Sequence, residues 1–556
     1  MNPHSATRSL HYTPSRPVVT IAAVAAAIVT VVWRVLTFPG FNNDHYIYMA
    51  GGQQMVLGEW PVRDFVDPGW PLMYAASGAA RALFGRNLGV ELGLVSCAFA
   101  IGAVFTLAAA SRLAGSVFAA SVVTVLEVAI NPRSFGYPKI ALYAVAAWLF
   151  VSGAARMSVP RTLGLAALTA VAFLFRHDHG LYIGVSALAA VLFGSWSGRP
   201  RSLLVRGCLF AAAVVALLLP WAAFVQYQVG LRDYLRPALE FSRAEAEGTV
   251  FRTLPHFDRH ALALGQTNLE VWLFYLFHSI PAIGIVLAVW RARHGTERWV
   301  GESAAVAAIG VMAIAFNLGV IRKPLSARLP DAAVPAAVLG AWLMARAWQA
   351  RTFVPRFAGV AASTIVLAVT TWAVIVVADV RNELNTAGIL NRRGALAERI
   401  EDLKHRLARP MPERDHVPSR NSEALMPFYA FVQRCTGRDD RLIMTGLSPD
   451  VFVLANRGFA GGQMAFRPSF YTFQPDQARA LRRLRAQSVP FVIVALEEEP
   501  RFRSDMPLIA SYVDAHYDRL AHIPVHGTSG LQLYVERGRM AAAPDRATGW
   551  PCFGTR

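Results

Sequence analysis

Long apolar runs recur along the first two thirds of the chain and restrict its fold more than any other feature. The first covers Val18–Thr37, and others follow at roughly 88–110, 115–131, 138–155, 162–175, 180–196, 203–225, 270–290, 302–320, 330–348 and 357–379. Because about 20 apolar residues in a helix cross the hydrocarbon core of a bilayer, this pattern predicts about eleven transmembrane helices. A composition with 54% hydrophobic and 16% charged residues agrees with a polytopic α-helical membrane protein.

Positive charges are distributed unevenly around these runs. With the amino terminus inside, the inside connections are rich in arginine and carry almost no acid, whereas the opposite connections mix acids and bases. The positive-inside rule therefore predicts a cytoplasmic amino terminus, and an odd number of spans places everything after Asp379 outside. The first run lacks a small-residue cleavage site before Pro39-Gly40, so we expect it to stay as an anchor.

The net charge of +18 comes almost entirely from arginine, since lysine occurs only at Lys139, Lys323 and Lys404. A basic stripe interleaved with aromatic residues would indicate nucleic-acid binding, but the sequence has none. The arginines lie at the ends of apolar runs, where membrane orientation and anionic headgroups explain them. We therefore expect membrane lipids as partners and no nucleic acid.

The pattern changes after residue 380. Short β-rich runs, "RLIMTG" and "PFVIVAL", alternate with stretches of helical apolar spacing, "PDQARALRRLRAQ" and "MPLIASYVDAHY", and the end reads as two strands joined by a Gly/Ser turn. The sequence thus predicts a transmembrane domain at 1–380 with a long first external loop at 39–87, a charged connector at 381–420, and an extracytoplasmic α/β domain at 421–556. Cys435 and Cys552 of that last domain could form a disulfide if it lies outside.

The first external loop holds the best candidate for chemistry. Asp44 and His45 follow the first span, and "GEWPVRDFVDPGWPLMY" leads into an amphipathic piece, "PLMYAASGAARALFG", that could lie along the membrane surface. Asp44 could be a solvated acid beside interfacial tyrosines, or an acid presented at the lipid–water boundary. The sequence leaves both interpretations open.

A second polar cluster, "RHDHG", separates two apolar runs on the predicted side of Asp44. Its four polar side chains are Arg176, His177, Asp178 and His179. So close to the bilayer, they are costly unless they pair with one another or take part in function. They could form a charge-compensated turn or a substrate site, and zinc binding by the histidines lacks a third ligand at a suitable spacing.

Cations at the external ends of later spans are candidates for binding phosphate. Lys139, Arg322, Lys323 and Arg328 all lie on a side that normally disfavours positive charge. A phosphate site or contacts with lipid headgroups would explain them. The mixed stretch from Leu231 to His260 could be a lid or a surface loop, and Tyr234, Phe241 or His256 in it could contact a sugar.

The motifs of the first loop resemble those of membrane glycosyltransferases of the GT-C fold. Asp44-His45, Gly58, Pro61, Arg63-Asp64-Phe65, Pro68 and Pro71 follow the first helix in the order found in relatives of protein O-mannosyltransferase and lipid A aminoarabinose transferase, the family 39-like group. The resemblance extends in topology over residues 18–380, and its motifs are concentrated in residues 41–74.

The resemblance implies that a sugar, a hexose or a pentose, moves with inversion from a polyprenyl-phosphate donor to a glycan, lipid or protein acceptor. The bacterial inner membrane is the implied location, with transfer on its outer face. Carried onto this chain, the implied catalytic base that takes the acceptor's proton is Asp44. From the residues themselves we expect Asp178 to assist in catalysis, and we expect substrate binding by His45, Arg63, Asp64, Arg176, His179, Lys139, Arg322, Lys323 and Arg328.

The chain departs from the family pattern in ways that leave other functions open. Many relatives carry an acid directly after the first aspartate or in the second external loop, whereas this chain has His45 and the acid-free "NPRSFGYPK". A divalent metal therefore remains possible but is not predicted. The alternatives are a transporter or flippase of a lipid-linked saccharide, and a non-catalytic envelope assembly protein.

Overall fold

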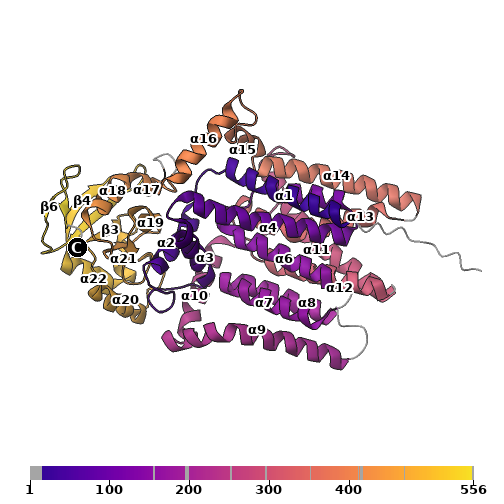
Figure 1. The fold of residues 1–556 in the computed structure, drawn as a ribbon, viewed down its shortest axis with the longest axis horizontal. Helices are drawn as coiled ribbons and strands as arrows, with labels where there is room; N and C mark the ends of the chain where they lie inside the picture. Colours follow the sequence, from indigo (N-terminus) through magenta and orange to yellow (C-terminus); the bar gives the residue numbers. More distant parts are fainter. Residues whose placement is uncertain are drawn as a thin grey trace, which may run out of the picture.

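Long helices run side by side through most of the molecule, and a region with a β-sheet adjoins one end of them (Figure 1). The computed structural model describes residues 15–153, 157–193, 200–250, 253–294, 297–350, 352–410, 412, 417–468 and 470–553. Several inside connections used to predict the orientation, at 154–156, 194–199, 295–296 and 351, lie outside the described residues. The orientation therefore stays a prediction.

A helix occupies each predicted span. The helices of the bundle are α1 (Arg16–Leu36), α4 (Leu88–Ala114), α5 (Val117–Ala129), α6 (Tyr137–Gly153), α7 (Val159–Phe175), α8 (His177–Phe193), α9 (Pro200–Gln228), α11 (Gln266–His294), α12 (Glu297–Asn317), α13 (Ala333–Trp348) and α14 (Phe353–Val377). Six stretches of the described chain are long and apolar enough to cross a membrane: Arg16–Leu36, Leu88–Ala114, Ser134–Gly153, Ser202–Gln228, Gln266–His294 and Phe353–Val377. The chain is a multi-pass membrane protein by these criteria, and the number eleven stays a prediction.

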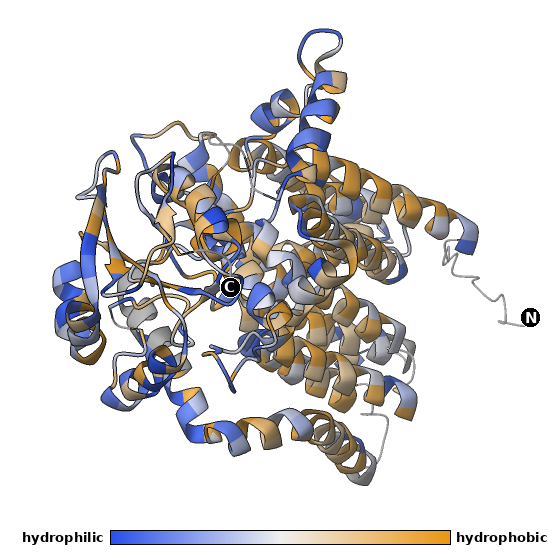
Figure 2. Ribbon diagram, turned by 60° about the vertical axis from the view of Figure 1, so that its left-hand side comes forward, coloured by the Kyte–Doolittle hydropathy of each residue, from blue (hydrophilic) through white to orange (hydrophobic). Residues whose placement is uncertain are grey.

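Small residues and caps define how the bundle packs. Asn87 caps α4 by accepting a hydrogen bond from Val90 N at 2.9 Å. A Cβ atom on Gly102 would lie 2.7 Å from Ile140 Cγ2, so this glycine lets α4 and α6 approach closely. Most residues of the bundle helices are hydrophobic (Figure 2). Many large hydrophobic side chains of these helices are exposed, as expected for surfaces that face lipid.

The region after the bundle contains a five-stranded sheet in the order β2-β1-β3-β5-β4. Strands β1 (Arg441–Met444), β2 (Gly458–Phe459) and β3 (Phe491–Ala495) are parallel, while β5 (Leu531–Glu536) is antiparallel to β3 and to β4 (Tyr517–Ile523). The helices are α17 (Arg420–Ala424), α18 (Met426–Cys435), α19 (Asp450–Ala455), α20 (Gln474–Ala486), α21 (Glu499–Asp505) and α22 (Pro507–His516). The strands and helices predicted from sequence in this region are present.

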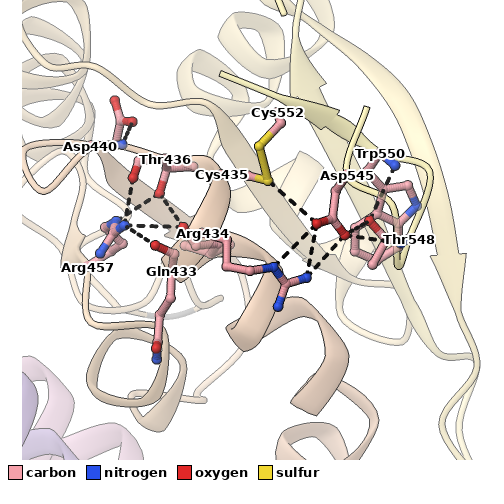
Figure 3. Close-up of a disulfide and its surroundings, with 12 residues drawn as sticks. Gln433, Arg434, Cys435, Thr436, Asp440, Arg457, Asp545, Thr548, Trp550 and Cys552 are labelled. Carbon is pink, nitrogen blue, oxygen red and sulfur yellow. Dashed lines mark hydrogen bonds and ion pairs between the residues drawn. A yellow bond between two sulfur atoms is a disulfide. The ribbon is translucent and has the colours of Figure 1, made fainter. Parts of the chain in front are cut away.

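A disulfide joins the end of α18 to the last described residues. Cys435 and Cys552 are bonded across a separation of 117 residues, and Cys552 belongs to the short hairpin of β6 (Ala543–Pro544) and β7 (Pro551–Cys552) (Figure 3). The neighbouring Arg434 forms an ion pair with Asp545 at 3.1 Å. The hairpin is thereby fastened to α18.

Three further helices, α2 (Asn43–Val56), α3 (Pro71–Phe84) and α10 (Leu231–Thr249), lie between the bundle and the sheet region (Figure 1). The predicted surface piece at Pro71–Gly85 is α3, and the first half of the predicted loop is α2. The short helices η1 (Ser134–Gly136), η2 (Leu325–Ala327) and η3 (Leu329–Ala332) precede α6 and α13. In the connector, α15 (Val380–Thr386) and α16 (Ala395–Ala408) follow α14.

Candidate functional site

Asp44 lies in the first turn of α2 with its side chain exposed. The helix begins there because Asn42 caps it, accepting a hydrogen bond from His45 N at 3.1 Å. The Asp44 carboxylate forms no hydrogen bond or ion pair with the part of the chain that the structure describes. It is therefore open to a ligand from outside the protein.

His45 follows Asp44 in the same turn and is completely buried. Its Nε2 is 2.9 Å from Glu91 Oε1, and Ser77 Oγ donates to Glu91 Oε2 at 2.8 Å. The ring also stacks on Phe41 with the centroids 4.3 Å apart. The predicted substrate contact of His45 does not fit this position, because successive helical residues point about 100° apart and His45 turns into the core. Its observed role is to anchor α2.

Two adjacent glycines bring α2 against α3. A Cβ atom on Gly51 would lie 2.2 Å from Tyr74 Cδ1, and one on Gly52 would lie 2.7 Å from Gly78 N. No larger residue fits at either position without moving α3. The "GG" of this polar segment is thus a packing feature of a helix.

The sheet region holds α2 from the other side. Gln53 Nε2 donates to the carbonyl oxygens of Phe452 and Arg457, each at 2.9 Å. The Gln54 amide bonds both the carbonyl oxygen and the N–H of Phe459, at 3.1 and 3.2 Å. Because all of these groups are buried, the sheet region helps to set the position of the helix that carries Asp44.

Tyr48, one turn after Asp44, marks where charged groups from several elements converge. Burial raises the pKa of Tyr48 to about 12; Arg176 opposes this shift, while the carboxylates of Asp44, Asp178 and Asp331 reinforce it. Three acids and one arginine from α2, the α7–α8 turn and η3 therefore act on a single phenol. The structure thus brings Asp44 and Asp178, which are far apart in sequence, to the same end of the bundle.

Arg176 and Asp178 form a bidentate ion pair in the turn between α7 and α8. Arg176 Nε donates to Asp178 Oδ1 at 2.9 Å and Nη2 to Oδ2 at 2.8 Å. Both side chains keep about a third of their surface exposed, 33% and 38%. This is the charge compensation expected of a tight turn, and the exposed edges also remain accessible to a ligand.

His179 is buried beside this pair. Its Nδ1 lies 2.5 Å from Tyr143 Oη, and Asp178 Oδ1 accepts a hydrogen bond from the His179 backbone N–H at 2.9 Å. Within the described residues its Nε2 has no hydrogen-bond partner. His179 therefore supports the turn from inside, and direct substrate contact would need this ring to become exposed.

The other predicted cations are Lys139, which lies near the start of α6, and three residues of the connection between α12 and α13. Lys139 is buried with its Nζ 2.5 Å from Asp331 Oδ2, and sequence reasoning overlooked that acid although it lies only three residues after Arg328. Arg322 acts electrostatically on Tyr182 together with Arg176 and Asp178, which places it in the same region. The remaining cations of that connection are Lys323, which is exposed, and Arg328, which is half-buried.

Arg63 and Asp64 shape the loop between α2 and α3. They form an exposed ion pair at 2.6 Å, and Asp64 Oδ2 accepts a hydrogen bond from Trp60 N at 2.7 Å. Arg483 of α20 donates to the Arg63 carbonyl oxygen. The structure thus supports a role for both residues in loop geometry, and their predicted contact with substrate stays a prediction.

Asp67 is a buried acid that sequence reasoning did not single out. Its Oδ1 accepts hydrogen bonds from Gly69 N at 2.9 Å and Trp70 N at 2.7 Å, and its Oδ2 lies 2.9 Å from Tyr234 Oη. Burial raises the pKa of Asp67 although these contacts oppose the shift. An Asp-Pro-Gly sequence is a signal for such a turn, but it does not reveal the tyrosine.

Metal binding has little support from the side chains. In the described part of the chain, no group of three or more histidine, cysteine, aspartate or glutamate residues is arranged to hold a metal ion. Asp44, Asp178 and Asp331 act on the same tyrosine without forming such a group. No residue is therefore assigned to a metal.

Comparisons with known proteins give a limited result. No protein-family model matches the chain, and no curated protein matches it. Among solved structures, it is similar to the crystal structure of ArnT from Cupriavidus metallidurans bound to undecaprenyl phosphate, with 14% identity, coverage of 94% of this chain and 98% of that chain, and a TM-score of 0.45. A TM-score of this size does not establish a common fold, so membership of the GT-C group stays a prediction.

Proposed function

We propose that this protein is a membrane glycosyltransferase of GT-C type that transfers a sugar from a polyprenyl-phosphate donor to a cell-envelope acceptor. The observation that supports it most is the position of Asp44 on a helix fixed from three sides. Its exposed carboxylate has no partner among the described residues, and it acts on the same tyrosine, Tyr48, as Arg176 and Asp178. A solvated surface acid would not need such anchoring. A general base does, because it must meet the proton that it accepts.

In the proposed reaction, the acceptor hydroxyl attacks the anomeric carbon of the sugar. Asp44 takes the hydroxyl proton as the new C–O bond forms, and the bond between the anomeric carbon and the phosphate oxygen breaks. A correctly placed base contributes roughly 10²–10⁴-fold to the rate. Attack opposite the leaving group inverts the anomeric centre.

The departing polyprenyl phosphate needs positive charge nearby. Arg176 is suited to this because its guanidinium is partly exposed beside Asp178, and Arg322 lies in the same region. Lys139 is less suited, since Asp331 offsets its charge inside the protein. We therefore assign the phosphate first to Arg176 and Arg322, and give Asp178 the role of orienting Arg176.

The proposed location is the bacterial inner membrane, with the sheet region outside. The Cys435–Cys552 disulfide supports this placement because such bonds persist in oxidising compartments. Helix α2, which carries Asp44, lies at the same end of the bundle as the sheet region (Figure 1), so the reaction would take place on the outer face.

The test is transfer of radiolabelled sugar from a panel of polyprenyl-phosphate sugars to endogenous acceptors in membranes. Asp44→Asn should reduce transfer by about 100-fold or more at equal protein level. The matched control is Asp439→Asn, since Asp439 is an exposed acid of the sheet region. Transfer unaffected by Asp44→Asn would remove that residue from the mechanism, and no transfer from any donor would favour a transporter of a lipid-linked saccharide.

A further inference from the structure

Asp67, Tyr234 and His177 form a chain of hydrogen bonds across three elements. Tyr234 of α10 places its Oη 2.9 Å from Asp67 Oδ2 and 3.0 Å from His177 Nε2. On its other side, His177 Nδ1 lies 2.8 Å from the carbonyl oxygen of Phe173. The chain thus connects the α2–α3 loop, α10 and the first residue of α8.

The hydrogens available to this chain can be counted. The Phe173 oxygen can only accept, so His177 Nδ1 carries a hydrogen, and in a neutral ring Nε2 is then an acceptor. An ionised Asp67 is also an acceptor, and the single Tyr234 hydroxyl hydrogen cannot serve both. The observed contacts therefore need one additional proton, on Asp67 or on His177.

Asp67 is well arranged to hold that proton. Its Oδ1 accepts the two backbone N–H groups and needs no hydrogen of its own, while Oδ2 faces Tyr234. With the proton on Oδ2, Asp67 donates to Tyr234, Tyr234 donates to His177, and His177 donates to Phe173. Every hydrogen bond of the chain is then satisfied.

We propose that Asp67, Tyr234 and His177 form a proton-dependent latch that fastens α10 to the α2–α3 loop and to the start of α8, and that loss of its additional proton opens it. When the proton is lost, two buried acceptors face one hydroxyl hydrogen, so one contact to Tyr234 breaks. Tyr234 is the only member of the three that belongs to α10. The inference does not depend on the proposed function, but His177 directly precedes Asp178, so an open latch would also free one side of that turn.

Close packing around the chain favours two distinct states over gradual loosening. A Cβ atom on Gly69 would lie 2.8 Å from His177 Cδ2, and the His177 ring packs at 4.0 Å on Phe173 and at 5.1 Å on Trp221. Within this space the imidazole has little freedom to turn. A change of protonation must therefore be absorbed by Tyr234 and α10.

Other ionisable groups surround the latch. Asp67 acts electrostatically on Tyr74 of α3 and on Tyr471 of the sheet region, and Asp178 acts on His177. A small cavity next to Asp67 and Tyr234 is also lined by Asp233, Asp476, Arg479 and Arg483. Burial raises the pKa of both tyrosines further above neutral pH, and it also raises the pKa of Asp476. The hydrogen-bond count assigns the additional proton to the latch itself, because Asp67, Tyr234 and His177 contact one another directly.

The direction of the pH effect follows from Asp67. Its pKa is raised by burial, so the folded protein favours the protonated carboxyl. The stabilisation that the latch gives to the folded protein is complete below the ordinary pKa of a carboxyl. It is lost as pH rises through the raised pKa of Asp67. We therefore expect α10 to be held at low pH and released at higher pH.

The test measures hydrogen exchange of the full-length protein in nanodiscs, with protection factors corrected for intrinsic rates from about pH 5 to 9. In the wild type, protection of α10 should fall by about tenfold or more as pH rises, the loss expected when one buried hydrogen bond is left unmade. Asp67→Asn should keep α10 protected throughout, because its amide N–H replaces the acid proton toward Tyr234. Tyr234→Phe should leave α10 weakly protected at every pH.

Controls separate the latch from general unfolding. Tyr517→Phe removes a buried tyrosine hydrogen bond to Val489 in the sheet region, and it should leave the α10 profile unchanged. The hydrogen-exchange protection of α4 should be equal in all variants. If it is lower in Tyr234→Phe, that variant is replaced by Tyr234→His. A wild-type profile independent of pH, an Asp67→Asn profile like the wild type, or full protection in Tyr234→Phe would each overturn the latch.

Discussion

At the scale of single residues, two neighbours at the start of α2 have opposite roles. Asp44 faces outward without a partner among the described residues, while His45 faces inward and contacts Glu91, which also accepts a hydrogen bond from Ser77. Asp44 therefore depends on a buried network for its position although it takes no part in it. The chemistry and the anchoring are thus divided between adjacent side chains.

Removing Glu91 should destabilise the protein without touching the proposed base. Glu91→Ala leaves His45 Nε2 and Ser77 Oγ buried without their partner, which costs on the order of 1–3 kcal/mol for each unsatisfied group. Glu91→Gln should cost less, because its amide oxygen still accepts from His45 and its amide N–H can donate to Ser77. Thermal unfolding in detergent measures both. Equal midpoints for Glu91→Ala and wild type, or a large drop for Asp44→Asn, would contradict this division of roles.

At the scale of elements, α2 and the sheet region behave as one unit. The Gln53 and Gln54 amides form hydrogen bonds with the backbone of α19 and β2, and Glu59 forms an ion pair with Arg441 of β1. The carboxylate and the guanidinium are 3.0 Å apart and largely buried, with 18% and 9% of their side-chain surfaces exposed. A pair in such surroundings couples more strongly than a solvated one.

A double-mutant cycle should show that coupling. We expect Glu59→Ala and Arg441→Ala to interact by more than about 1 kcal/mol in thermal unfolding, above the usual value for exposed pairs. The matched control is Asp518 with Arg537, an ion pair at 2.9 Å whose side chains are 58% and 52% exposed, and its coupling should be clearly smaller than that of the buried pair. Similar values for the two cycles would mean that Glu59 and Arg441 do not hold the sheet region in place.

These elements also show where sequence reasoning succeeds. Apolar runs locate the helices of the bundle because lipid-facing and buried helices must both be hydrophobic along their length. The strands Arg441–Met444 and Phe491–Ala495 stand out because buried parallel strands are continuous apolar runs. The amphipathic piece that became α3 is visible for a similar reason. Each of these patterns is local.

The features that sequence reasoning missed depend on partners distant in the chain. The segment of α2 looks like a loop because "GGQQ" lacks apolar spacing, yet its glycines fit against α3 and its glutamines bond to the sheet region. The roles of Asp331 and Asp67 follow from their contacts with Lys139 and Tyr234, which are distant in the sequence. His45 was expected to bind substrate, and only the structure shows that it points inward.

At the scale of the whole molecule, the direction of the chain through the membrane decides whether the proposed reaction is possible. The sheet region positions α2 and so must lie on the same side as Asp44 (Figure 1). If the polyprenyl-phosphate sugar reacts on the outer face, the side that carries Asp44 and the sheet region must be extracytoplasmic. The Cys435–Cys552 disulfide offers a direct way to test this, because the other two cysteines, Cys97 and Cys208, are free.

Cysteine labelling should therefore report both the bond and the side of the membrane. In wild-type protein denatured without reductant, a PEG-maleimide should modify two cysteines, and after reduction it should modify four. In Cys435→Ser, Cys552 loses its partner, and a membrane-impermeant maleimide should reach it in intact spheroplasts, because Cys552 is half-buried in the sheet region and outside the bilayer. Cys435→Ser/Cys552→Ser is the matched control, since it retains only Cys97 and Cys208 within membrane helices. Labelling of Cys552 only after permeabilisation would place the sheet region and Asp44 in the cytoplasm, and transfer on the outer face would then be excluded.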